Sequence, residues 1–188
     1  MIEILSASES VKSNQPLIIF DRDDTLIENI PSLKSHIDIK WLPNRLETLV
    51  EIMNSNVNVA IATNQACIGK GNLTEKDYIE VSNAILKKLA DVGVVPIAII
   101  ACPHSYEEVT REPICYCRKP NPGMLERILE IHGRKNKNAL FVGDSKTDYE
   151  ATLKCESQID FIYSETDGQK FYDLVKNWIL SLEHNDRN

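Results

Sequence analysis

The stretch Leu17–Thr25, LIIFDRDDT, decides the fold. Its first four residues form an apolar run that predicts a short strand buried on both faces. Asp21 and Asp23 follow directly, and in an extended backbone two side chains so spaced point the same way. Such a pair can bind a hard divalent cation and still present one oxygen as a nucleophile. An isolated pair of this kind is more often a polar turn, so the rest of the chain has to decide between the two interpretations.

Four more apolar runs resemble buried strands, and helical patterns separate them. We expect these strands over 57–62, 97–101, 139–142 and 159–163, and helices over 44–53, 74–92, 123–132, 147–154 and 169–182. Such alternation is typical of a parallel sheet covered by helices on both faces. We therefore predict an α/β fold, a Rossmann-like three-layer sandwich with a mainly parallel sheet of five strands. Residues 1–15 are expected to be a loosely ordered N-terminal extension and 16–188 a single domain.

Composition limits the function classes. The chain has 188 residues, a net charge of −7 and 43% hydrophobic residues. The negative charge argues against nucleic acid or an anionic membrane as the main partner. The sequence has no apolar run long enough for a transmembrane helix, and residues 1–15 lack the pattern of a secretory signal. We expect a cytoplasmic protein, in which the five cysteines need an explanation other than disulfides.

The predicted strand ends carry the polar residues. In open sheets of this kind, ligands bind at the carboxyl ends of the strands. The residues at those ends are Asp21, Asp23, Thr63, Asn64, Cys102 and Asp144. This convergence favours a functional site over a simple turn at the opening stretch.

Four motifs in order resemble the haloacid dehalogenase superfamily of aspartate-nucleophile phosphatases. They are the strand followed by DRDDT, the strand-end Thr63, the step Lys119-Pro120, and Gly143-Asp144 with Asp148. The resemblance implies that Asp21 attacks phosphorus and that Asp23 is the general acid and base. It implies Mg²⁺ bound by Asp21, the backbone carbonyl of Asp23, and Asp144. Thr63 and Lys119 would contact the phosphate, with Asp148 orienting Lys119 or the waters of the metal.

Cys102, His104, Cys115 and Cys117 form a complete set of zinc ligands. Three thiolates and an imidazole suit tetrahedral zinc, and four protein ligands leave no open position for chemistry. Buried free thiols and disulfides are the alternatives. We predict a structural zinc site in the loop 102–117, which would hold the following Arg118 and Lys119 in place.

The same loop resembles the D-glycero-D-manno-heptose 1,7-bisphosphate 7-phosphatases. The matching residues are Cys-Pro-His at 102–104, Cys-x-Cys-Arg-Lys-Pro at 115–120 and Asn-Pro-Gly-Met at 121–124, with Ala-Thr-Asn-Gln at 62–65. The resemblance implies that Thr63, Asn64, Gln65, Arg118 and Lys119 contact a small phosphorylated sugar. Arg118 would suit a second phosphate, because its planar guanidinium can bind two oxygens.

Three hypotheses remain open from the sequence. The first is a Mg²⁺-dependent sugar-phosphate phosphatase, and the second is a histidinol-phosphatase or another small phosphomonoesterase. The third is a zinc-stabilised domain that binds phosphorylated ligands without turnover. Asp24 departs from the glycine that the resembling family usually has there, and it adds a third carboxylate. The segment after Thr25 is short, so we expect a minimal cap, an open site and a monomer.

Overall fold

The structure is a computed structural model that describes residues 1–6, 14–107, 113–133 and 138–185. Parts of two predicted segments, residues 7–13 of the extension and 108–112 of the zinc loop, lie outside the described residues. In the described part, no helix is long and apolar enough to cross a membrane.

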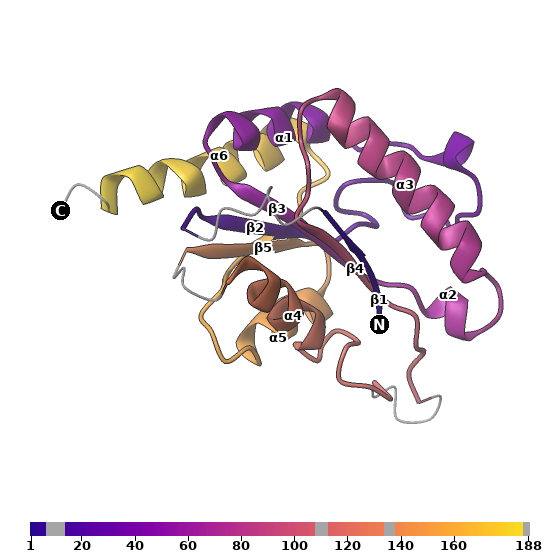
Figure 1. The fold of residues 1–188 in the computed structure, drawn as a ribbon. Coiled ribbons are helices and arrows are strands. Elements are labelled where there is room, and N and C mark those ends of the chain that lie inside the picture. Colours follow the sequence, from indigo (N-terminus) through magenta and orange to yellow (C-terminus); the bar gives the residue numbers. More distant parts are fainter. Residues whose placement is uncertain (7–13, 108–112, 134–137, 186–188) are drawn as a thin grey trace.

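A six-stranded sheet forms the middle layer (Figure 1). Its strands are β1 (Ile2–Leu5), β2 (Leu17–Phe20), β3 (Asn58–Asn64), β4 (Ala98–Cys102), β5 (Ala139–Gly143) and β6 (Asp160–Tyr163). Their order across the sheet is β1-β4-β3-β2-β5-β6. All neighbouring pairs are parallel except β1 and β4, which are antiparallel.

The prediction of five strands is wrong. Ile2–Leu5, which we expected in a loosely ordered extension, pairs along β4 from Ile2 opposite Ala101 to Leu5 opposite Ala98. The strand is too short to stand out by pattern, and it exists because β4 offers an edge with which to pair. The sheet is therefore mixed rather than purely parallel.

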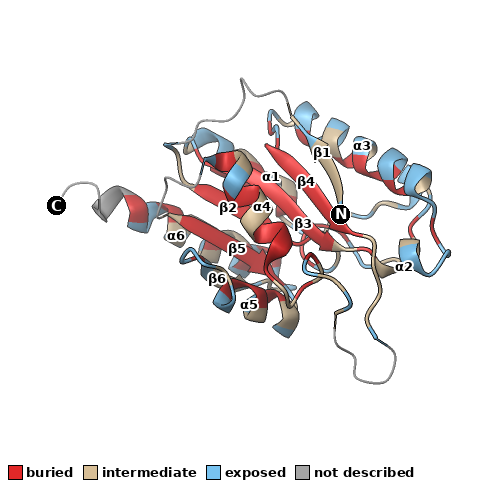
Figure 2. Ribbon diagram, turned by 60° about the horizontal axis from the view of Figure 1, so that its bottom comes forward, coloured by how far each residue is buried: buried red, intermediate tan, exposed pale blue. Residues whose placement is uncertain are grey.

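Helices cover both faces of the sheet (Figures 1 and 2). They are α1 (Arg45–Asn54), α2 (Ala66–Gly69), α3 (Glu75–Asp91), α4 (Gly123–His132), α5 (Lys146–Leu153) and α6 (Gly168–Asn185), with a 3₁₀ turn at His36–Asp38. Helices α1, α3 and α6 share one hydrophobic cluster with one face of the strands. Helices α4 and α5 pack on the opposite face. The three-layer prediction is confirmed, and the predicted helix 123–132 has the observed bounds.

The central strand β2 is fully buried, as its apolar sequence predicts. Ile18 and Phe20 pack toward α1, α3 and α6, whereas Leu17 and Ile19 pack toward α4 and α5. Phe20 pairs with Ile61 on one side and Val142 on the other. The residues that follow these three positions therefore meet at one edge of the sheet.

Candidate active site

A cavity of about 200 Å³ lies at the carboxyl ends of β2, β3 and β5. It is lined by Asp21, Asp23, Asn29, Thr63, Asn64, Lys119, Asp144, Ser145, Thr147 and Asp148. All of the predicted catalytic residues are in this set. The structure thus brings together residues from four distant parts of the chain, as the strand-end argument predicts.

Lys119 lies between two carboxylates at the floor of the cavity. Its Nζ is 2.7 Å from Oδ1 of Asp21 and 2.6 Å from Oδ1 of Asp148, and it donates to the carbonyl of Ala62 at 2.9 Å. All three ionisable side chains are buried, with Lys119 3% exposed. Two carboxylates hold the pKa of Lys119 above its usual value although burial opposes this. Of the two roles that the resemblance implied for Asp148, the structure shows the contact with Lys119.

The carboxyl group of Asp21 has a strongly raised pKa. Burial raises the pKa of Asp21 to about 7; Asp148 and Asp23 add to the rise, and Lys119 opposes it. A cation close to the carboxylate restores the charged form. The environment of Asp21 therefore favours binding of a metal ion or another positive group.

Asp23 is held by two neighbours that the sequence did not reveal. Arg22 donates to both carboxylate oxygens, with Nε 3.0 Å from Oδ1 and Nη2 2.9 Å from Oδ2. Gln65 donates from Nε2 to Oδ2 of Asp23 at 2.8 Å and to Oγ1 of Thr63 at 2.9 Å. Gln65 was expected to contact substrate, and in the structure it also connects two of the predicted catalytic residues.

Asn64 binds the backbone of Lys119 at both polar atoms. Its Oδ1 accepts from the amide of Lys119, and its Nδ2 donates to the carbonyl of Lys119, each at 3.1 Å. The end of β3 thereby fixes the segment that carries the lysine. Asn64 lines the cavity, and both of these hydrogen bonds position Lys119. Its contact with substrate stays a prediction.

The acidic residues can hold a divalent cation. Asp21, Asp144 and Asp148 each offer a carboxylate oxygen, and these atoms lie within 4.8 Å of one another. Carboxylate oxygens are the ligands that Mg²⁺ prefers, so the residues present fit this ion. Asp148 is less available than the other two, because it pairs with Lys119 and closes a capping box with Ser145 at the start of α5. The structure thus favours Asp21 and Asp144, two of the predicted ligands.

The Cys/His cluster also assembles. The sulfurs of Cys102, Cys115 and Cys117 are 3.3–3.5 Å apart, and Nδ1 of His104 is 3.3 Å from the sulfur of Cys117. Ligands at the zinc–sulfur distance of about 2.3 Å in a tetrahedron are separated by roughly 3.8 Å. The donor set and the spacing fit zinc, while the predicted ion itself stays a prediction. Cys67 and Cys155 lie outside this cluster.

The cysteine loop is connected to two basic residues near the site. Arg118 donates from Nη1 to the carbonyl of His104 at 3.0 Å, and its guanidinium lies 5.4 Å from the ring centre of Tyr106. Lys70 lies 4.8 Å from the same ring centre. The aromatic face can attract both cations. The loop therefore holds Arg118, as predicted, and also contacts Lys70.

A second cavity of about 250 Å³ adjoins the first. The two share Asp23, Asn29 and Asn64, and the second is also lined by Arg22, Gln65, Ala66, Cys67, Lys70, Asn72 and residues 30–32. A ligand whose phosphate lies beside Asp21 can extend into this second cavity. Its walls are mainly polar, which suits a hydroxyl-rich molecule.

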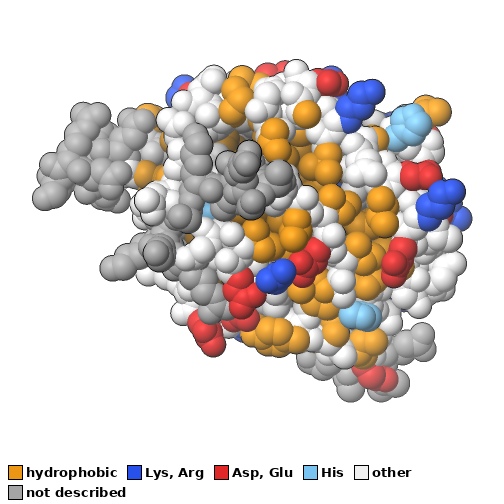
Figure 3. Space-filling view, in the orientation of Figure 1, with side chains coloured by type: hydrophobic (Ala, Val, Ile, Leu, Met, Phe, Trp, Pro, Cys, Tyr) orange, Lys and Arg blue, Asp and Glu red, His pale blue; other side chains and the backbone are white. Residues whose placement is uncertain are grey.

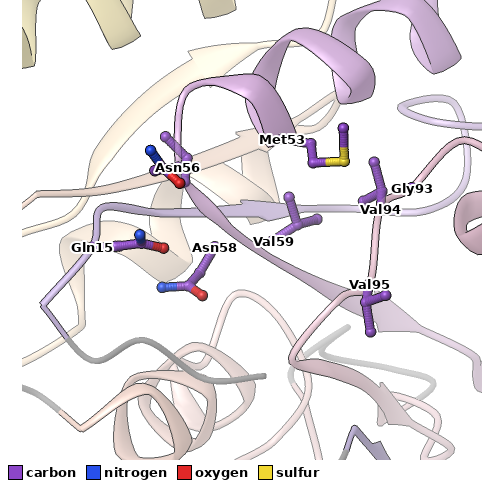
Figure 4. Close-up of a pocket in the computed structure, with 9 residues that line it drawn as sticks. Gln15, Met53, Asn56, Asn58, Val59, Gly93, Val94 and Val95 are labelled. Carbon is purple, nitrogen blue, oxygen red and sulfur yellow. The ribbon is translucent and has the colours of Figure 1, made fainter. Parts of the chain in front are cut away.

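Another hollow lies at the opposite end of the sheet (Figure 4). It is lined by Gln15, Met53, residues 56–59, and Gly93, Val94 and Val95. None of these side chains is ionisable, so the hollow lacks the groups that phosphoryl transfer needs. On the face in Figure 3, lysine and arginine side chains are scattered rather than gathered, in keeping with the net charge of −7.

A mainly parallel sheet with a buried lysine–aspartate pair and further carboxylates at the carboxyl ends of its strands is the arrangement expected of an aspartate-dependent phosphatase. The comparisons agree with this class. The model of the family described as polynucleotide kinase 3 phosphatase matches residues 16–174. The chain therefore belongs to this family and to the haloacid dehalogenase superfamily of phosphatases, and it is a phosphoric monoester hydrolase.

Individual relatives are heptose bisphosphate phosphatases. The D-glycero-beta-D-manno-heptose-1,7-bisphosphate 7-phosphatase of Pseudomonas aeruginosa is 32% identical over 148 residues, 77% of this chain and 79% of that protein. The protein of Thermoplasma volcanium named as a probable enzyme of this kind is 32% identical over 68% of this chain and 84% of its own. The crystal structure of D,D-heptose 1,7-bisphosphate phosphatase from B. bronchiseptica, complexed with magnesium and phosphate, has a TM-score of 0.68 and 27% identity, covering 85% of this chain and 87% of that chain.

Proposed function

We propose that this protein is a Mg²⁺-dependent phosphatase that hydrolyses D-glycero-D-manno-heptose 1,7-bisphosphate at the 7-phosphate through an aspartyl-phosphate. The observation that carries the proposal is the position of Asp21. Its carboxylate lies at the end of the central strand, 2.7 Å from Lys119, in a cavity that also holds Asp23, Thr63 and Asp144. The arrangement supplies a nucleophile, an acid and base, and positive charge in one place.

The two carboxylate oxygens of Asp21 have different surroundings. Oδ1 accepts from Lys119, while Oδ2 has no hydrogen-bond partner among the described residues. In the first step an oxygen of Asp21 bonds to phosphorus and the bond to the leaving oxygen breaks. Asp23 gives its proton to that oxygen, which leaves as an alcohol.

In the second step water is the nucleophile. Asp23 takes a proton from the water, the water oxygen bonds to phosphorus, and the bond to Asp21 breaks. Phosphate leaves and both carboxylates return to their starting forms. Arg22 and Gln65 orient the side chain of Asp23 at the wall of the cavity.

Three groups would balance the charge of the phosphate. Lys119 contributes a buried cation, and Thr63, which lines the cavity, would donate a hydrogen bond from its hydroxyl to a phosphate oxygen. Mg²⁺, held by Asp21 and Asp144 and by the backbone carbonyl of Asp23, would neutralise charge that develops on the phosphoryl oxygens. Zinc in the cluster of Cys102, His104, Cys115 and Cys117 would be structural, because those four ligands complete its coordination.

The sugar substrate rests on the relatives and on the shape of the site. The relatives named above act on a heptose bisphosphate according to their names. The second cavity continues from the first, and Lys70 lines it. Arg118 lies by the ring of Tyr106, as Lys70 does, and we propose these two cations as the site of a second phosphate. We further propose a single domain, which includes β1 because that strand pairs with β4, and a cytoplasmic monomer.

Phosphate release from a small panel tests the proposal. The panel contains heptose 1,7-bisphosphate, histidinol phosphate, a 3′-phosphorylated oligonucleotide and p-nitrophenyl phosphate, each with Mg²⁺. The oligonucleotide is included because of the family description, although the charge of −7 argues against it. We expect the highest kcat/KM with the heptose. A higher value with another compound would reassign the substrate, and no release from any of them would refute the enzymatic function.

A further inference from the structure

Asp24 has an unfavourable backbone conformation beside the candidate active site. Its φ is 54°, in the left-handed region. A residue with a Cβ is disfavoured there, whereas glycine is not. The side chain is exposed, so packing does not compensate. Non-glycine residues that keep such a conformation next to a functional site often have a role there.

The carboxylate of Asp24 binds one residue at two points. Its Oδ1 accepts from the backbone amide of Asn29, and its Oδ2 accepts from the side-chain Nδ2 of Asn29, each at 3.2 Å. The two bonds fix both the backbone of Asn29 and the orientation of its amide. Because Nδ2 faces Asp24, Oδ1 of Asn29 is the atom left for another partner, and it has none among the described residues.

Asn29 lies where the two cavities of the site meet. With Asp23 and Asn64, it lines both of them. In the proposed reaction, with the phosphate beside Asp21, this position would be next to the leaving group. The basic side chains of the second cavity, Arg22 and Lys70, can only donate hydrogen bonds. A ligand hydroxyl there also needs an acceptor. Of the two amide side chains that line both cavities, Asn64 already accepts from Lys119 through Oδ1, whereas Oδ1 of Asn29 accepts from none of the described residues.

We infer that Asp24 is a positioning residue for specificity: it holds Asn29 so that Oδ1 accepts a hydrogen bond from a hydroxyl of the leaving group. The inference rests on the proposed function, because it names the part of the substrate that this site selects. The pair favours polyol phosphates over phosphates whose leaving group has no hydroxyl to donate. It has no direct part in the transfer of the phosphoryl group.

Asp24→Gly tests the inference, because glycine adopts the observed φ without cost and the fold is retained. The readout is the ratio of kcat/KM for heptose 1,7-bisphosphate to that for p-nitrophenyl phosphate. We expect this ratio to fall about two- to twelvefold, the size of one lost neutral hydrogen bond, through a higher KM for the sugar. An unchanged ratio, or an equal loss on both substrates, would overturn the inference.

Two further variants sharpen the test. Asn29→Ala removes the acceptor itself, so it should lower the ratio as much as Asp24→Gly, and the double variant should be no worse than either. Additive losses would overturn the link between the two residues. Asn56→Gly is the matched control, because Asn56 is also exposed with a φ of 54° but lies at the opposite end of the sheet. We expect its ratio to equal that of the wild type.

Measurements on the wild-type protein distinguish failure of the proposed function from failure of the role given to Asp24 and Asn29. If the wild-type protein releases phosphate from neither compound, the proposed function fails before any variant is compared. If it is active and the variants keep the wild-type ratio, only the role of Asp24 and Asn29 fails.

Discussion

The ammonium of Lys119 lies 2.7 Å from the carboxylate of Asp21, and both side chains are buried at the end of the central strand. The pair joins residues 98 positions apart in the sequence. Burial alone would favour the neutral form of each partner. The contact with Lys119 therefore opposes the rise that burial causes in the pKa of Asp21.

Replacement of Lys119 by methionine should harm both stability and activity. The change leaves Asp21 and Asp148 buried without their cation, so we expect a loss of about 3 kcal/mol in the free energy of unfolding. The kcat should fall more than about 100-fold, because a fixed positive charge at the phosphate is lost. Urea unfolding and phosphate release measure the two effects. Lys76→Met, at an exposed ion pair, is the control and should change neither the free energy of unfolding nor kcat. A wild-type kcat in Lys119→Met would refute the role of the lysine.

Binding of Mg²⁺ should depend on pH around neutrality. The pKa of Asp21 without metal is raised to about 7, mainly by burial. Below that pH the metal must displace a proton, so its affinity should rise as the pH increases through about 7 and then level off. Titration calorimetry at pH 6 and 8, in buffers of different ionisation enthalpy, would detect the released proton. Equal affinity at both pH values would contradict the assignment of Asp21 as a ligand.

The contacts around Asp23 predict a variant with a selective effect on kcat. Gln65→Leu removes the donor to both Asp23 and Thr63. Loss of this orientation should lower kcat about ten- to 100-fold with a smaller change in KM, since the acid and base must be placed accurately. Steady-state kinetics measure the split. Gln169→Leu, on the exposed surface of α6, should behave as wild type; a Gln65→Leu effect confined to KM would point instead to substrate contact.

Loss of the predicted zinc should lower stability and weaken substrate binding, although the cluster itself does not line the candidate active site. Cys117→Ser removes one ligand from the cluster, and the loop also fixes Arg118 through His104. We expect the bound zinc to disappear, Tm to fall by about 5–10 °C and KM to rise. Elemental analysis and thermal unfolding give these values. Cys155→Ser, outside the cluster, should keep its zinc; a wild-type protein purified without chelator and free of zinc would refute the metal assignment.

A buried histidine should make the protein less stable in mild acid. His132 is 1% exposed and lies 3.0 Å from the amide of Asn58, and burial lowers the pKa of His132 below its usual 6.5. Near pH 6.5 the imidazole of His132 therefore binds a proton in the unfolded chain but stays neutral in the folded protein. The free energy of unfolding should therefore fall as the pH drops below about 6.5. His132→Gln should flatten this dependence, whereas the exposed His36→Gln should retain it; equal slopes in both variants would contradict the account.

The sequence predicted the parts of the fold that depend on local pattern. The buried strand Leu17–Phe20 and the helix Gly123–His132 have the expected bounds. The strand is a continuous apolar run and the helix has a helical apolar period, and in each case polar or glycine residues mark where the element ends. Strand Ile2–Leu5 was missed because it depends on the edge of β4. Helix Ala66–Gly69 was missed because four residues are too few to show a helical period.

At the site, too, the sequence predicted what depends on local pattern and missed what depends on the folded arrangement. Residues at strand ends were predictable because parallel strands bring their carboxyl ends together. The contacts of Arg22 with Asp23, and of Asn64 with Lys119, depend on how the turns place the side chains. Gly143 illustrates the same limit, because a Cβ there would lie 2.6 Å from Cβ of Asp148, a contact that only the fold reveals.

The central claim is that Asp21 carries the phosphoryl group during turnover. The most direct measurement is peptide mapping by mass spectrometry of protein quenched in acid while it hydrolyses its substrate. We predict one phosphoryl group on the peptide that contains Asp21 and none in Asp21→Asn, which should also release no phosphate. A phosphorylated residue elsewhere, or turnover that survives Asp21→Asn, would contradict the account.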